Sequence, residues 1–146
     1  MDERIQRLTT PEECMSLAEN VRDRNPELAR EARRRAVELR AIAHGSKNAV
    51  ETELWKALYA YEEVLFEKHK RRTRATYTRR MIDKYGIIMA AEKAVSNKKE
   101  TKGYIELVAM GLHDLTFEAV IVRYPQTFSP EVVTLAKARL EKLKEI

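Results

Sequence analysis

One segment of the sequence concentrates side chains of the kind that contact phosphates. Between Lys68 and Lys84 the chain carries eight cationic side chains and one acidic side chain, Asp83. The whole chain has a formal net charge of +5 at pH 7, so the residues outside this segment are slightly acidic in sum. A positive charge confined to one segment produces the local field that attracts the phosphates of nucleic acids.

Hydroxyl and aromatic side chains lie between these cations. Hydroxyl groups bond to phosphate oxygens, and an aromatic ring such as that of Tyr77 stacks on a nucleobase. A helix over residues 73–85 would bring Thr73, Tyr77, Arg80 and Lys84 to one side. The sequence therefore predicts a nucleic-acid-binding surface, for which DNA is favoured over RNA. Its candidate residues are Lys70, Arg71, Arg72, Thr73, Arg74, Thr76, Tyr77, Arg79, Arg80 and Lys84.

Two other interpretations fit the same composition. The segment could be a solvated, arginine-rich face of a stable domain, or it could attract acidic proteins or lipids. A second basic zone, residues 22–40, is interrupted by acids at helical spacing, for example Glu31 four residues before Arg35. Pairs at this spacing neutralise each other on a helix surface, so ordinary surface pairing is the better interpretation there.

Motifs for catalysis, metal binding or cofactor binding are not recognisable. The three histidines, His44, His69 and His113, do not stand at metal-ligand spacing with cysteines or carboxylates. A glycine-rich phosphate loop and a nucleophile elbow are also missing. Cys14 follows two glutamates, which oppose thiolate formation, so we interpret it as structural. We therefore expect no enzyme activity, no metal and no cofactor, and an accessory or regulatory role.

The elements that would position the basic segment are predicted to be helices. Glycine and proline are scarce, at four each, so few turns can be built and the elements must be long. Three helix starts share one pattern, a capping residue followed by proline and glutamate, at 10–12, 25–27 and 129–131. The pattern predicts an all-α protein, a single compact bundle of about seven or eight helices forming one domain over residues 1–146.

Apolar periodicity predicts which residues form the core. Residues 49–69 show the clearest helical stripe. Residues 112–122 are apolar on nearly all sides, which fits a buried helix or a buried strand; we favour a helix because no partner strand is evident. The predicted core consists of Leu54, Leu58, Tyr61, Leu65, Met81, Ile82, Leu115, Val122, Ala136 and Leu140.

Composition also limits the environment and the alternatives. A single cysteine excludes an internal disulfide and fits a reducing cytoplasm, and no apolar run is long enough to cross a membrane. The alternative function is a helical protein–protein interaction module or a small homodimer with no nucleic-acid role. That alternative requires the apolar residues 112–122, or Trp55 and Tyr59, to be partly exposed.

Overall fold

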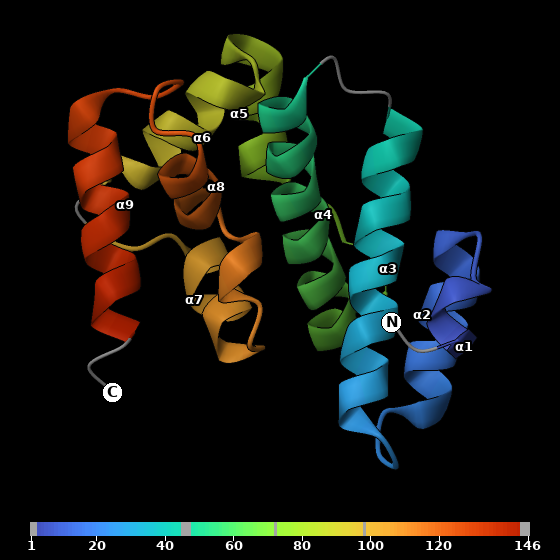
Figure 1. Ribbon diagram of the computed structural model, residues 1–146. Helices are drawn as coiled ribbons and strands as arrows, with labels where there is room; N and C mark the ends of the chain where they lie inside the picture. The colour runs from blue at the N-terminus through green and yellow to red at the C-terminus, as the bar shows by residue number, and fades with distance from the viewer. Residues whose placement is uncertain (1–2, 45–47, 72, 98, 144–146) are drawn as a thin grey trace. The chain divides into compact units, whose positions relative to one another are not determined.

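The structure, a computed structural model, describes residues 3–44, 48–71, 73–97 and 99–143. Within these ranges every regular element is helical: nine α-helices and one short 3-10 helix (Figure 1). The prediction of an all-α protein is confirmed, and the number of helices is close to the predicted seven or eight. None of the helices in the described ranges combines the length and apolarity needed to cross a bilayer.

The chain divides into two compact units, Met1–Ser46 and Lys47–Ile146. The arrangement of these units as one domain over residues 1–146 stays a prediction, and each unit is described by itself below. All candidate residues of the predicted nucleic-acid surface belong to the second unit.

Three helices form the first unit: α1 (Glu3–Gln6), α2 (Pro11–Val21) and α3 (Pro26–His44). The predicted starts of α2 and α3 are confirmed. Thr10 and Glu13 form a reciprocal cap, in which the Glu13 N–H donates to Thr10 Oγ1 at 3.2 Å and the Thr10 N–H donates to Glu13 Oε1 at 3.1 Å. Asn25 Oδ1 accepts the Leu28 N–H at 3.1 Å. The helices pack around a buried cluster of Ile5, Ala18, Leu28, Ala29 and Ala32.

The second unit contains six α-helices and the 3-10 helix. In chain order these are α4 (Ala49–His69), α5 (Thr76–Tyr85), α6 (Ile87–Val95), α7 (Lys102–Ala109), η1 (His113–Leu115), α8 (Phe117–Arg123) and α9 (Pro130–Lys142). Of residues 112–122, left open between helix and strand, 113–115 lie in η1 and 117–122 in α8, so the favoured helix is present with a break at Thr116. The start of α9 at Pro130 is confirmed, although the Ser129 side chain makes no capping bond. The Ser129 N–H donates instead to Glu92 Oε1 at 2.7 Å.

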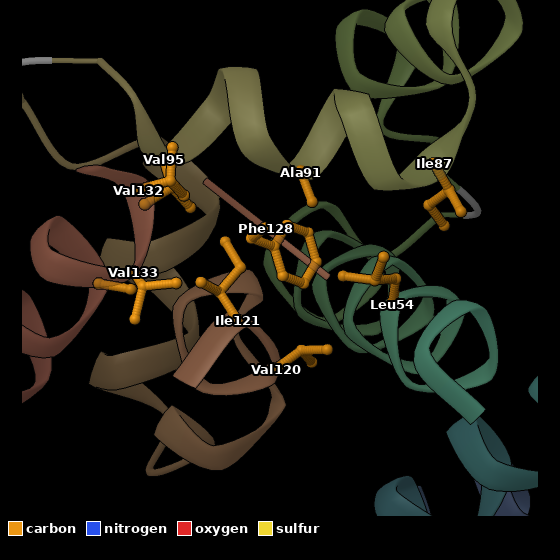
Figure 2. Close-up of a cluster of buried hydrophobic side chains, with 10 residues drawn as sticks. Leu54, Ile87, Ala91, Val95, Val120, Ile121, Phe128, Val132 and Val133 are labelled. Carbon is orange, nitrogen blue, oxygen red and sulfur yellow. The ribbon is translucent and has the colours of Figure 1, made fainter. Parts of the chain in front are cut away.

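The main core of this unit lies where α4, α6, α8 and α9 meet. Figure 2 shows the Phe128 ring among Leu54 of α4, Ala91 of α6 and Ile121 of α8. Val120 and Ile121 are fully buried. Because α8 lies between α4 and α9 (Figure 1), it contacts apolar neighbours on opposite sides, which explains why its sequence lacks a polar face.

Candidate nucleic-acid interface

The basic segment begins where α4 ends. Lys70 adopts a left-handed conformation, with φ of 57°, and its N–H donates to the Phe66 carbonyl at 2.7 Å, which terminates the helix. The next helix, α5, begins at Thr76, so the predicted helix over residues 73–85 is wrong for its first three residues. The Thr73 hydroxyl donates to the Arg71 carbonyl at 3.1 Å, a local bond that competes with helix formation.

Because α5 begins at Thr76, fewer of the predicted site residues share one side of a helix. Thr73 and Arg74 lie on the connection between α4 and α5, so Thr73 does not continue the side of α5 that carries Tyr77, Arg80 and Lys84. These last three residues, at helical positions i, i+3 and i+7, are all exposed. Tyr77 has 75% of its surface exposed, which leaves its ring accessible for stacking.

Arg79 points inward to a carboxylate of α4. Its Nε and Nη2 donate to the two oxygens of Glu62 at 2.6 and 2.8 Å, and the Ala75 N–H donates to the same carboxylate at 2.9 Å. The bond to Glu62 raises the pKa of the Arg79 guanidinium, whose carbon lies 5.9 Å from the centre of the Tyr59 ring. We refer to this arrangement as the Glu62 clamp. In the Glu62 clamp the positive charge of Arg79 is paired with an acidic side chain of the same unit.

Two lysines of the segment also have acidic partners. Lys68 Nζ lies 3.0 Å from Glu106 Oε1 of α7, and Lys70 Nζ lies 3.3 Å from Glu67 Oε2 of α4. Each pair lowers the positive potential around its lysine. Together with the Glu62 clamp, these pairs engage three of the eight cations that the sequence places in the segment.

The remaining described cations of the segment face solvent. Arg71, Arg74, Arg80 and Lys84 are exposed, and in the part of the chain that the structure describes the three arginines form no ion pair. Arg72, a predicted site residue, lies outside the described residues. The hydroxyl of Thr76 is exposed near Arg74, and Thr73 is half-buried. The exposed cations and Tyr77 are referred to below as the basic face.

One lysine beyond the predicted segment adjoins the basic face. The Tyr85 ring has Lys84 Nζ 5.2 Å and Lys93 Nζ 4.5 Å from its centre, so it holds two cations by cation–π attraction. Lys93 belongs to α6, after the break at Gly86, which has a φ of 85°. Sequence reasoning missed Lys93 because the orientation of α6 relative to α5 is not encoded in local spacing.

Among the described residues, His, Cys, Asp and Glu side chains form no group of three or more that could hold a metal ion. Comparison with known proteins found no family model, no curated protein and no solved structure that matches the chain.

Proposed function

We propose that the chain is an accessory nucleic-acid-binding protein, with DNA favoured over RNA, and that its basic face contacts phosphates. The observation that carries the proposal is the exposure of Arg71, Arg74 and Arg80 without acidic partners in the described ranges, beside the 75%-exposed Tyr77. Arginine guanidinium groups contact phosphate oxygens in a bidentate manner. An exposed tyrosine between them offers a ring on which a base can stack.

The ion pairs reduce the number of phosphates that the segment can neutralise. Lys68, Lys70 and Arg79 are engaged by acids, so Arg71, Arg74, Arg80 and Lys84 are the principal contributors among the described residues. Each neutralised phosphate changes the logarithm of the duplex-DNA binding constant by about −0.9 per logarithmic unit of salt. Four contacts therefore correspond to a salt slope of roughly −3.6, which is about half of the value that the eight cations of the sequence would suggest.

The alternative, a protein–protein interaction module, is supported only by the partial exposure of Trp55 and Tyr59. Leu112, Val120 and Ile121 are buried, and Trp55 and Tyr59 are half-buried. The exposed large apolar residues of the second unit, apart from Tyr77 and Tyr85, are Met89, Ile105 and Leu135 on three different helices. Scattered apolar residues of this kind are common on monomeric proteins.

The test is fluorescence anisotropy with labelled duplex DNA, single-stranded DNA and RNA at several salt concentrations. The variant changes Arg71, Arg74 and Arg80 together to glutamine. Its matched control removes the same amount of charge from exposed lysines elsewhere in the second unit, Lys99, Lys137 and Lys142. We expect the first variant to lose at least tenfold in affinity and the control to lose less than threefold.

Tyr77→Ala separates stacking from charge. If Tyr77 stacks on an unpaired base, this variant weakens single-stranded binding more than duplex binding, by about 1–3 kcal/mol per stacked base. Equal losses in the arginine variant and the lysine control would show that binding depends only on net charge. Absence of binding by the unmodified chain at low salt would refute the proposal outright.

A further inference from the structure

A cavity of about 430 Å³ lies inside the second unit, next to the basic face. Its walls come from α4, α5 and the connection that precedes it, the C-terminal end of α6, the N-terminal half of α7 and the beginning of α8. Small-molecule sites in proteins have volumes of about 300–1,000 Å³ and are mostly pre-formed. The cavity is therefore large enough for a small organic molecule.

Apolar side chains form most of its wall. They come from four helices and include Leu58, Tyr61, Leu65, Met81, Leu107 and Phe117. Tyr61 and Met81, which line the cavity, are only half-buried. An occupant would remove this apolar surface from water, which favours binding by about 0.8 kcal/mol for each buried methylene group.

The polar groups around the cavity favour a negative charge. Arg74 and Lys102 both line it, are exposed, and have no ion pair in the ranges described. Thr101, the N-cap of α7, accepts the Tyr104 N–H at 3.2 Å through its hydroxyl oxygen, so its O–H proton remains available to donate. The N-terminal end of α7 adds the positive end of the helix dipole beside Lys102.

The one acidic group in the wall is already neutralised. Glu118 Oε2 accepts a hydrogen bond from Arg139 Nη1 at 3.0 Å, and both side chains are buried. Arg139 also donates to the Asn97 carbonyl. Burial raises the pKa of the Glu118 carboxyl group, and the bond from Arg139 acts against that rise. Glu118 therefore does not oppose an anion held at Arg74 and Lys102.

We propose that this cavity binds a medium-chain fatty carboxylate. The hydrocarbon chain lies among the apolar residues of α4, α7 and α8, and the carboxylate is held by Arg74, Lys102 and the Thr101 hydroxyl. The apolar lining selects the hydrocarbon part, and the two unpaired cations select the anionic end. This inference goes beyond nucleic-acid binding, although Arg74 and Tyr77 belong to both surfaces.

Calorimetric titration of the full chain with a matched set of probes tests the charge requirement. The probes are decanoate, decan-1-ol and decylammonium, each below its aggregation concentration, with adenosine monophosphate as a polar anion of different shape. We expect decanoate to bind at least tenfold more tightly than the alcohol, and the amine not to bind. Affinity should rise about fourfold per methylene from hexanoate to decanoate.

Two pairs of matched variants locate the site. Arg74→Gln with Lys102→Gln removes the cations that line the cavity, whereas Arg71→Gln with Lys99→Gln removes two nearby exposed cations that do not. The first pair should weaken decanoate binding at least tenfold, and the second by less than twofold. Ala94 also lines the cavity and is half-buried, so Ala94→Leu should fill part of the volume and weaken decanoate and the alcohol alike.

The inference would be overturned if decanoate showed no saturable binding, or if decanoate and the alcohol bound with equal affinity. It would also be overturned if the two variant pairs lost equal affinity for decanoate, or if adenosine monophosphate bound more tightly than decanoate. Both double variants, each of which changes one arginine and one lysine, alter exposed residues, so they remain informative if Ala94→Leu fails to fold. The test is also separable from nucleic-acid binding, because Arg71→Gln alone should weaken the binding of DNA but not of decanoate.

Discussion

The Glu62 clamp should determine whether α5 stays attached to the rest of the second unit. None of the residues of α5 is fully buried, and the half-buried Ile82 packs against the core clusters, so apolar burial fixes the position of the helix only in part. A single carboxylate also accepts three hydrogen bonds, one from the Ala75 N–H and two from Arg79. Glu62→Gln keeps the shape of the side chain but removes its charge and replaces one acceptor with a donor that faces Arg79.

The size of the effect follows from the exposure of the pair. Breaking a buried ion pair costs about 3–5 kcal/mol, and a hydrogen bond to a charged group contributes about 1.5–3 kcal/mol. The Arg79 side chain is 26% exposed and that of Glu62 is 10% exposed, so water can partly solvate the guanidinium in the variant. We therefore expect a cost at the lower end, about 2–3 kcal/mol.

Hydrogen exchange of the α5 amides measures this cost directly, because α5 can open without unfolding the whole unit. A cost of about 2–3 kcal/mol corresponds to roughly 30- to 150-fold faster exchange, at 1.36 kcal/mol per factor of ten. The control is Glu67→Gln, which breaks the more exposed pair with Lys70 and should cost less than about 1 kcal/mol. Equal and small effects of the two substitutions on α5 would refute the role assigned to Glu62.

Three further predictions concern stability and reactivity. Cys14 is fully buried, and burial raises the pKa of its thiol, so it should resist iodoacetamide in the native protein and react once urea unfolds the chain. The hydrogen bonds from Thr9 and Thr10 lower the pKa of Glu13 below its ordinary 4.5. The stabilising effect of Glu13 should therefore be complete above pH 4.5 and disappear as the pH falls through the lowered pKa of the folded state. The difference in Tm between the parent and Glu13→Gln should accordingly shrink on acidification, and a difference that grows would contradict this. Phe128→Ala should lower the free energy of unfolding in urea by about 3–5 kcal/mol, because the ring fills the core between α4, α6 and α8.

Local sequence signals predicted the helices well because helix ends depend on neighbouring residues. The patterns at Thr10, Asn25 and Ser129 each precede a helix that begins at the following proline. The same reasoning failed at Thr73, where no local signal distinguishes a helical threonine from one that bonds the Arg71 carbonyl. The boundary depends instead on Glu62, which accepts the Ala75 N–H from 13 residues away.

Four of the ten predicted core residues are confirmed as buried. Leu54, Leu58, Leu65 and Ala136 are buried, as expected. The other six predicted core residues are only half-buried: Tyr61, Met81, Ile82, Leu115, Val122 and Leu140. Of these, Tyr61 and Met81 line the cavity. Periodicity identifies the inward side of a helix, but it contains no information on whether the space opposite that side is filled. The cavity could not be predicted, since its wall is assembled from five separate stretches of chain.

The basic segment shows why a charge count along the sequence overestimates a binding surface. Glu62, Glu67 and Glu106 lie on α4 and α7, and they engage Arg79, Lys70 and Lys68 respectively. Part of the positive charge of the segment therefore pairs with acidic side chains of α4 and α7.

Arginines that are adjacent in the segment can differ in their environment. Arg79 stabilises the helix by binding Glu62 through Nε and Nη2, which engages these two donors inside the fold. Arg80, the next residue, is exposed, because a rotation of about 100° per residue turns it away from α4. Fixing α5 through Arg79 holds Tyr77, Arg80 and Lys84 in a constant arrangement. A pre-ordered surface loses less conformational entropy when it binds, so in the proposed function Arg79 would raise the affinity for nucleic acid without contacting it.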